Sequence, residues 1–261
     1  MSKFSIIVPT LNSNTVNKLV NSIKSQTWND WEVFFIDGGS HKKHINYLKE
    51  LSISDKRISF LKQSKSKKGI FGAMNQGLEI IDKNSWILFL GSDDTLKDSF
   101  VLEKINNKIN ALELSKIDLL ICKGIYFDAK KSIYRREAYF IPRQGDSFLN
   151  LDDYKKLIFR GYTPPHQTTL FNGNSKVLRD QYNDDYSISG DLELFCRITN
   201  FRKLSVLNSS LNIVTMSTGG ISDTKHLLKL KEVIVCYVKY YKFRFIYTLI
   251  CRYFNKFRSV L

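Results

Sequence analysis

Two adjacent aspartates, Asp93 and Asp94, follow an apolar run at Trp86–Leu90 after only Gly91 and Ser92. The run is too short for a convincing helix, and its uniform apolarity predicts a strand buried on both faces. Open α/β sheets bind ligands at the carboxyl ends of their strands. Paired carboxylates there suit a divalent cation that also holds a substrate diphosphate. The same two acids also fit an ordinary turn, with Asp94 or Thr95 near a helix N-cap.

Two further acids stand at element boundaries. Asp37 follows the predicted strand Trp31–Ile36 and precedes Gly-Gly-Ser. An acid at that position can accept hydrogen bonds from the base or ribose of a nucleotide, and the glycines let backbone approach a ligand. Asp-Gly-Gly-Ser is equally compatible with a simple turn. Asp191 opens the predicted helix Asp191–Thr199, where it is either an N-cap or a general base.

Two less specific segments are also candidates for ligand binding. The stretch from Gly69 to Gly77 is rich in small residues, so the start of its helix can bring backbone N–H groups near phosphate or sugar. It lacks the Gly-Lys-Ser/Thr ending of a Walker loop. His166 and Gln167 follow two prolines. The imidazole is a candidate base, metal ligand or hydrogen-bond donor to diphosphate, and a structural role is the alternative.

Strand and helix patterns alternate over the first 127 residues, which predicts a mostly parallel sheet covered by helices on both faces. The segment 129–174 is expected to be irregular, because its prolines interrupt regular structure. The predicted strands are Phe4–Thr10, Trp31–Ile36, Ile58–Leu61, Trp86–Leu90 and Asp118–Phe127, and the predicted helices between them are Val16–Ser25, Ile45–Leu51, Gly72–Ile81 and Phe100–Leu112.

The net charge of +15 implies anionic partners, such as nucleic acid, phosphorylated substrates or an acidic membrane surface. The four cysteines form no CxxC pair, which fits reduced thiols in the cytosol. From His226 to Leu261 the chain is aromatic and basic, with Glu232 as its single acid. No stretch of 18 uncharged residues exists there, so a spanning helix is disfavoured. Two short helices joined near Tyr241–Phe243 are expected either to lie on an anionic membrane surface or to pack on the rest of the protein.

The order of these motifs resembles that of the family 2 inverting glycosyltransferases of GT-A fold. Within that family it is most similar to bacterial enzymes that build O-antigen or other surface polysaccharides. The resemblance covers roughly residues 3–222. It implies a Rossmann-like GT-A catalytic domain over 1–222, with a nucleotide-binding half at 1–127 and an acceptor-binding half at 128–222. The tail, 223–261, is then a basic, helical, membrane-associating segment. The segments that carry the likeness are Val8–Asn12, Ile36–Ser40, Gly69–Asn75, Ser92–Asp94, His166–Gln167, Gly190–Asp191 and Gly219–Ser222.

The resemblance also implies roles for individual residues. Asp191 matches the catalytic base, and Asp93 with Asp94 matches the DXD-type site for Mn²⁺ or Mg²⁺, Asp94 being the direct ligand. His166 and Gln167 match a pair beside the acceptor or diphosphate. Three positions depart from the family pattern: Gly190 stands where many relatives carry Glu, and Lys67 and Gly72 stand where members often carry acids. The implied nucleotide-sugar site consists of Pro9, Thr10, Asn12, Asp37, Gly69, Asn75 and Asp93.

The activity implied is transfer of a hexose, glucose or galactose, from a UDP-sugar to a polyprenyl-diphosphate-linked sugar. A single displacement inverts the anomeric centre, and the expected location is the cytoplasmic face of a bacterial inner membrane, with no nucleic acid as partner. Two alternatives come from other classes. A nucleic-acid-binding protein would explain the charge, but no signature of such a module appears. A sugar nucleotidyltransferase would share the nucleotide site and acids, but the Gly-rich N-terminal loop of many such enzymes is missing.

Overall fold

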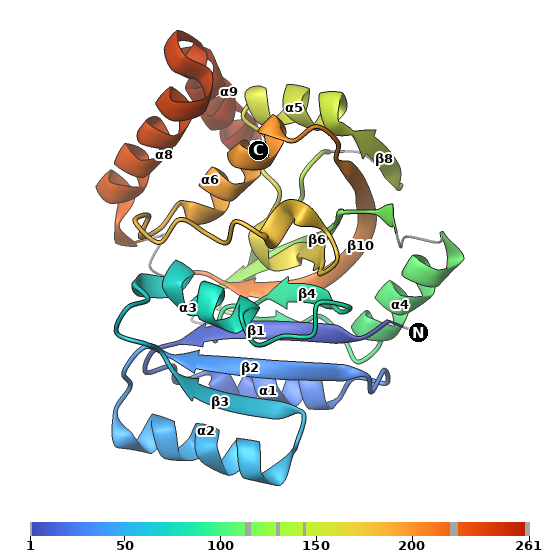
Figure 1. The fold of residues 1–261 in the computed structure, drawn as a ribbon, viewed down its shortest axis with the longest axis vertical. Coiled ribbons are helices and arrows are strands. Elements are labelled where there is room, and N and C mark those ends of the chain that lie inside the picture. Colours follow the sequence, from blue (N-terminus) through green and yellow to red (C-terminus); the bar gives the residue numbers. More distant parts are fainter. Residues whose placement is uncertain (1, 113–115, 129–130, 143–144, 220–223, 259–261) are drawn as a thin grey trace.

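Strands and helices alternate through the N-terminal half of the chain in a computed structural model (Figure 1). The structure describes residues 2–112, 116–128, 131–142, 145–219 and 224–258. The alternation predicted from the sequence is confirmed, with most boundaries shifted by one to three residues. The elements are β1 (Phe4–Thr10), α1 (Val16–Lys24), β2 (Trp31–Asp37), α2 (Lys42–Ser54), β3 (Ile58–Lys62), α3 (Gly69–Leu78), β4 (Trp86–Phe89), β5 (Thr95–Leu96), α4 (Val101–Ala111) and β6 (Leu119–Asp128).

The strands form one sheet in the order β3-β2-β1-β4-β9-β6-β10-β5, with β7 added to β6 and β8 added to β10. Strands β3, β2, β1 and β4 run parallel, and β10 runs parallel to β6. Because β9 lies antiparallel between β4 and β6, the two halves of the chain share the sheet. The carboxyl ends of β1, β2 and β4 therefore lie along one edge.

Each face of the sheet carries its own hydrophobic core, because side chains alternate along a strand. In β1, Ile6 and Val8 pack with α1, α2 and α4 on one face, and Ile7 packs with α3 on the other. Helix α1 directs four apolar residues at helical spacing, Val16, Leu19, Val20 and Ile23, into the first core. The mixed α/β sheet flanked by helices that the sequence predicts is confirmed.

The segment 129–174 was expected to be irregular, and this expectation is wrong. It contains β7 (Ile133–Ala138), β8 (Ser147–Asn150), α5 (Leu151–Phe159) and β9 (Thr169–Asn172). These elements are short, and β8 and β9 pair with strands distant in sequence, so periodicity alone does not reveal them. Asn150 caps α5 by accepting the backbone N–H of Asp153 at 3.0 Å. After α6 (Gly190–Arg197), the long strand β10 (Ser205–Ser217) crosses the sheet.

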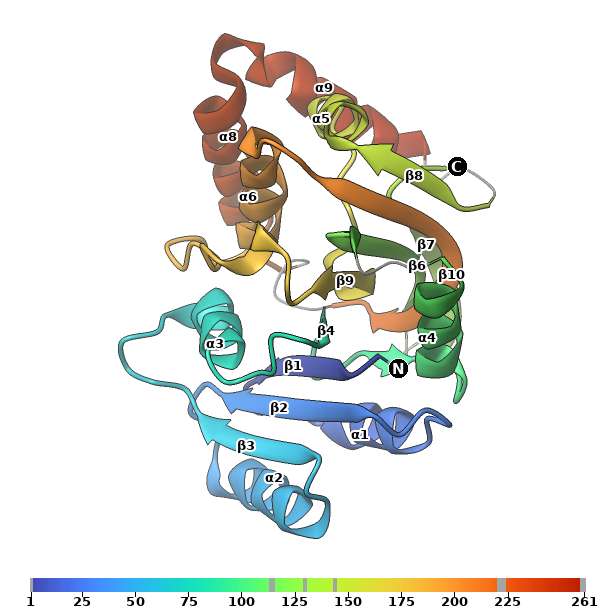
Figure 2. The ribbon, with the colours of Figure 1, turned by 45° about the vertical axis from the view of Figure 1, so that its right-hand side comes forward.

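The tail forms two helices, α8 (His226–Tyr241) and α9 (Phe245–Arg258), joined by a 3-10 turn at Lys242–Arg244. Figure 2 shows both helices against α5 and α6, at the end of the molecule opposite α2. The predicted pair of helices is confirmed. Helix α8 buries Val233, Cys236 and Tyr237 in the core that contains α6.

Among the described residues, no helix combines the length and the apolarity that crossing a bilayer requires.

Candidate active site at the carboxyl edge of the sheet

Asp37 ends β2 with one carboxylate oxygen unpaired. The parallel register places it beside Thr10, the last residue of β1. Its side chain is buried, and Oδ2 accepts the backbone N–H groups of Gly39 (3.1 Å) and Ser40 (3.0 Å). Oδ1 is shielded from solvent and has no hydrogen-bond partner within the described residues. A buried acceptor without a hydrogen bond lowers stability. The Oδ1 atom of Asp37 is therefore available to accept a hydrogen bond from an N–H or O–H group of a ligand.

The loops that follow β1 and β2 are joined beside Asp37. Thr10 Oγ1 hydrogen-bonds to Nε2 of His44 at 3.0 Å. Burial lowers the pKa of His44 despite the raising effect of Asp37, so the imidazole is neutral near pH 7. Asn12 adopts a left-handed φ of 52°, and its backbone N–H donates to Ser40 Oγ at 2.8 Å. The structure thus brings Thr10, Asn12 and Asp37 together and adds His44, which the sequence reasoning missed.

Asp93 and Asp94 lie on a turn that follows β4. A Cβ atom on Gly91 would lie 2.8 Å from Asp93 Oδ1 and 2.9 Å from Asp94 Oδ2, so glycine leaves room for both carboxylates. Asp94 is 3% exposed and accepts the Gly91 N–H at 2.8 Å. Burial and the neighbouring charge of Asp93 raise the pKa of Asp94 to about 7. Burial also raises the pKa of Asp93. A bound cation would favour the ionised form of both acids.

The donor set of this turn fits a hard divalent cation. No group of three or more His, Cys, Asp or Glu side chains that could hold a metal occurs in the described part of the chain. Mg²⁺ sites, however, commonly use one or two carboxylates and complete their shell with water and substrate phosphates. Asp93 and Asp94 are such a pair. The turn is braced by Ser217 at the end of β10, whose hydroxyl donates to the Asp93 carbonyl at 2.7 Å.

Asp191 lies in the first turn of α6, whose N-cap is Ser189, so the alternative of Asp191 as the N-cap is wrong. Its charge acts on His166, although burial dominates and lowers the pKa of that imidazole. His166 Nε2 hydrogen-bonds to Tyr182 Oη at 2.7 Å, and its ring stacks on Phe89 with 5.2 Å between centroids. Phe89 is the last residue of β4. The first turn of α6 and the turn that carries Asp93 and Asp94 therefore both adjoin one aromatic cluster, formed by Phe89, His166 and Tyr182.

The start of α3 approaches the start of α6. A Cβ atom on Gly190 would lie 2.7 Å from the ring of Phe71, so any side chain at this position would require Phe71 to move. Gly69 begins α3 with a φ of 57°. Asn75 is buried, donates to the Tyr182 carbonyl at 2.8 Å and accepts the Tyr182 N–H at 2.7 Å. Its amide thus connects α3 to the loop before α6, a role that the sequence did not indicate.

Pro9, Gln167, Gly72 and the loop Gly219–Ser222 are the other positions singled out from the sequence. Pro9 and Gln167 are half-buried, beside Thr10 and His166 respectively. Gly72 could not carry an acid, because a Cβ atom there would lie 2.7 Å from the Lys67 carbonyl carbon. Of the small-residue loop Gly219–Ser222, the last three residues lie outside the described residues.

Helix α8 holds the loop that precedes Asp191. The carboxylate of Glu232 accepts three consecutive backbone N–H groups, those of Ser187 (2.8 Å), Ile188 (2.9 Å) and Ser189 (2.7 Å). Ser189 is the N-cap of α6, and the other two N–H groups belong to the loop before it, so none of the three has a partner within the helix. The tail therefore fixes the entry into α6, and the sequence signal for it is the single acid in a basic segment.

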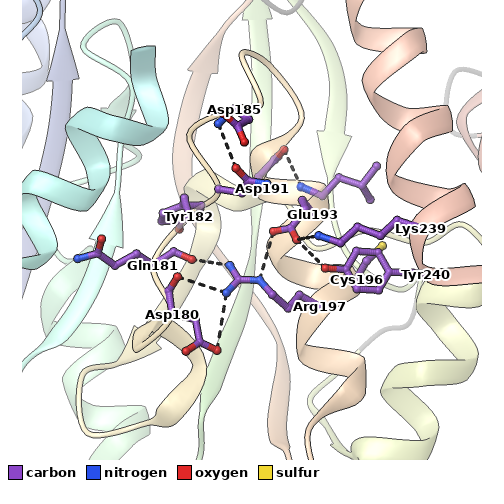
Figure 3. A network of polar contacts seen from close by, with 12 residues as sticks. Asp180, Gln181, Tyr182, Asp185, Asp191, Glu193, Cys196, Arg197, Lys239 and Tyr240 are labelled. Carbon is purple, nitrogen blue, oxygen red and sulfur yellow. Dashed lines mark hydrogen bonds and ion pairs between the residues drawn. The ribbon is translucent and has the colours of Figure 1, made fainter. Parts of the chain in front are cut away.

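A second acid links α6 to α8 within the same core (Figure 3). Glu193 is 1% exposed and accepts hydrogen bonds from Lys239 (3.0 Å) and from the hydroxyl of Tyr240. Arg197, one turn later on α6, approaches it at 3.2 Å. Burial of a carboxylate requires such partners. The orientation of α6, and with it the position of Asp191, thus depends on α8.

A model of the family described as "Glycosyl transferase family 2" matches residues 5–163 of the chain. The chain belongs to glycosyl transferase family 2. It is 31% identical over 240 residues to a GalNAc(5)-diNAcBac-PP-undecaprenol beta-1,3-glucosyltransferase of Campylobacter jejuni, covering 78% of this chain and 77% of that one. It is 27% identical over 225 residues to a PGL/p-HBAD biosynthesis glycosyltransferase of Mycobacterium bovis, covering 85% and 79%.

The fold of this glycosyltransferase is similar to that of a solved structure. The crystal structure of residues 1–349 of S. aureus TarS in complex with UDP superposes with a TM-score of 0.65 at 18% identity. The match covers 90% of this chain and 64% of that chain. The GT-A resemblance predicted from the sequence is confirmed, and it favours a glycosyltransferase over the two alternative classes.

Proposed function

We propose that this glycosyltransferase moves a hexose, glucose or galactose, from a UDP-sugar to a hydroxyl of a lipid-diphosphate-linked sugar, with inversion. The reaction would serve O-antigen or other surface-polysaccharide assembly at the cytoplasmic face of the inner membrane. The observation that carries the donor assignment is Asp37, whose unpaired buried oxygen lies at the strand edge that also leads into Asp93 and Asp94. UDP in the TarS complex and the lipid-linked substrate named for the Campylobacter relative support the donor and acceptor classes.

We assign the two substrates to different halves of the chain. Residues 1–127 would hold the nucleotide, with Asp37 accepting from the base or ribose beside Thr10 and Asn12. Pro9, Gly69 and Asn75 would shape that site. Residues 128–222 would hold the acceptor, with His166 and Gln167 near the acceptor or diphosphate.

Asp191 would act as the base. It would accept the proton of the acceptor hydroxyl as that oxygen attacks the anomeric carbon, while the bond from that carbon to UDP breaks. The electron pair of that bond leaves with the diphosphate. A bound Mn²⁺ or Mg²⁺, held by Asp93 and Asp94, would neutralise the charge on the leaving diphosphate. One displacement inverts the centre, so an α-linked donor gives a β-linked product.

The direct test is an assay with Mn²⁺, a panel of UDP-sugars and a polyprenyl-diphosphate-linked acceptor. The anomeric configuration of the product is read by NMR. A β-linked hexose from an α-linked donor supports the proposal. A product with retained configuration rules out the single displacement, and pyrophosphate release in place of UDP indicates a nucleotidyltransferase.

Asp37→Asn is expected to weaken UDP binding roughly tenfold or more, because a hydrogen bond to a charged group contributes about 1.5–3 kcal/mol. The amide keeps one acceptor oxygen, but its NH₂ group must then face either the ligand donor or the N–H groups of Gly39 and Ser40. Titration calorimetry with UDP measures the change. Asp30→Asn, at an exposed acid before β2, is the control and should bind UDP normally. Equal affinity in both variants would remove Asp37 from the nucleotide site.

We also propose that the outer face of α9 lies on an anionic membrane surface. Large apolar side chains remain exposed at helical spacing along it, although α8 is packed in the core. Flanking cations at Lys242 and Arg244 are exposed and suit acidic headgroups. On α9 the apolar stripe consists of Ile246, Tyr247, Ile250, Phe254 and Phe257, which are 51–65% exposed. Phe243, 80% exposed in the turn before α9, continues this apolar stripe.

The double variant Ile250→Glu, Phe254→Glu is expected to lower sedimentation with phosphatidylglycerol vesicles at least tenfold, because each side chain contributes about 1.5–3 kcal/mol when fully buried. Its melting temperature should stay near wild type, since both side chains are exposed in the folded protein. Ile53→Glu, at an 83% exposed residue on α2, is the matched control. Undiminished vesicle binding by the double variant would show that the stripe does not contact lipid.

A further inference from the structure

A cluster of basic side chains lies on the inner face of α9, near the proposed base. Arg252 and Lys256 stand four residues apart on α9, and Asp191 acts electrostatically on both. Lys229 of α8 and Arg136 of β7 also act on Lys256. Burial and these three neighbouring cations lower the pKa of Lys256 to about 7. Cations of α8, α9 and β7 therefore all act on Lys256. Arg252 and Lys256 share one face of α9 because they are four residues apart.

Contacts with neighbouring elements hold Arg252 in place. Arg252 Nη1 donates to Thr163 Oγ1 and to Tyr237 Oη, the latter at 3.3 Å. A Cβ atom on Gly161 would lie 2.4 Å from the Arg252 backbone nitrogen, so α9 packs directly on this loop. Asn255 Nδ2 also donates to the carbonyl of Arg160 at 2.9 Å. These contacts hold the guanidinium in place.

One N–H donor of the Arg252 guanidinium is not used by these contacts. The Nε atom of Arg252 is shielded from solvent and has no hydrogen-bond partner among the residues described. A buried donor without a partner is as costly as an unpaired acceptor. Guanidinium and ammonium groups together form a typical phosphate site, because the planar fork binds two oxygens and the ammonium adds a point charge.

We infer that Arg252 and Lys256, with Lys229 and Arg136 beside them, bind the diphosphate of a lipid-linked acceptor. This inference rests on the proposed function, because it assigns the acceptor's charged group to the same site. The base must reach a hydroxyl of the sugar next to that diphosphate or a few residues beyond it, and Asp191 is close to the cluster. The opposite face of α9 carries the apolar stripe. One helix would then contact both the membrane that holds the lipid and the diphosphate that joins lipid to sugar.

The test is binding of farnesyl diphosphate, compared with farnesol, to the full chain in the presence of saturating UDP and Mn²⁺, which occupy the donor site. Lys256→Gln is expected to weaken farnesyl diphosphate binding roughly tenfold or more, since it removes a charge-assisted contact. Lys256→Arg retains the charge and should bind nearly as wild type. Lys231→Gln, at an exposed lysine of α8, is the matched control and should be unchanged. Farnesol should bind all four proteins alike.

Several outcomes would overturn the inference. Equal affinity of wild type and Lys256→Gln for farnesyl diphosphate is one. Inorganic pyrophosphate that binds as tightly as farnesyl diphosphate would indicate a site for free anions. Lost binding to phosphatidylglycerol vesicles with intact farnesyl diphosphate binding would indicate a phospholipid headgroup site. If Lys256→Gln fails to fold by circular dichroism, Lys229→Gln carries the same expectation. Absence of UDP binding by wild type is a separate result, which would contradict the proposed function itself.

Discussion

Asp191→Asn is expected to reduce turnover by roughly 10²–10⁴-fold, because removal of a general base costs about that much. The amide cannot take the proton of the acceptor hydroxyl. Binding of UDP should be unchanged, since Asp191 lies on α6 and not at the carboxyl ends of β1 and β2, where Asp37 lies. The measurement is steady-state kinetics with saturating donor and acceptor, together with calorimetric binding of UDP. The KM for the acceptor should change much less than kcat.

A neighbouring acid provides the matched control for this variant. Asp185 is exposed and lies in the loop that leads to α6, as Figure 3 shows. Asp185→Asn removes the same charge from almost the same place and should leave turnover within a few-fold of wild type. If Asp191→Asn retains substantial turnover, or if Asp185→Asn loses as much, the base lies elsewhere.

The sequence predicted the N-terminal half of the fold because its signals are local. The apolar runs of β1, β2 and β4 need no distant information. Thr10 and Asp37 end β1 and β2, and Asp93 and Asp94 follow β4 within a few residues. Asp37, Asp93 and Asp94 were placed at the sheet edge by these strand ends alone. Because parallel strands expose their carboxyl ends on one side, correct strands were sufficient to predict which acids share an edge.

The second half was harder to predict, for a physical reason. Strand β9 has four residues and owes its existence to β4 and β6, which lie more than 40 residues away in the chain. In β10, polar residues interrupt the apolar alternation, and the register with β6 shifts between Asn208 and Val214. No window of the sequence shows a regular period there. Such strands form because their backbone pairs with strands that are already part of the sheet.

The supporting residues of the site were missed for a similar reason. Asn75 hydrogen-bonds to Tyr182, which is 107 residues away, and Glu232 caps a loop more than 40 residues before it. The chemistry of a side chain does not reveal its partner at that distance. The consequence concerns the tail, whose composition left membrane binding and packing on the rest of the protein both open. Helix α8 packs on α6 and holds the loop before Asp191, and exposed apolar side chains remain on both α8 and α9.

Asp94→Asn is expected to abolish most activity and also to stabilise the metal-free protein above pH 7. Burial, reinforced by Asp93, raises the pKa of Asp94 to about 7, well above the usual value for an aspartate. Between about pH 4 and 7 the folded protein therefore holds a proton that the unfolded chain releases, so the free energy of unfolding falls as pH rises through this window. Asparagine stays neutral at every pH and avoids that loss.

The pH dependence of metal use should follow from the same carboxyl. A cation needs the ionised form, so protons compete with it. In the wild-type protein the Mn²⁺ concentration for half-maximal activity should increase as pH is lowered below about 7. Thermal unfolding in EDTA at pH 8 and pH 5 measures the stability effect: the variant should melt above wild type at pH 8, with a smaller difference at pH 5. With Mn²⁺ and UDP the order should reverse, because only wild type gains the ligand's stabilisation. A variant that melts below wild type in EDTA at pH 8 would show that Asp94 stabilises the fold and does not await a cation.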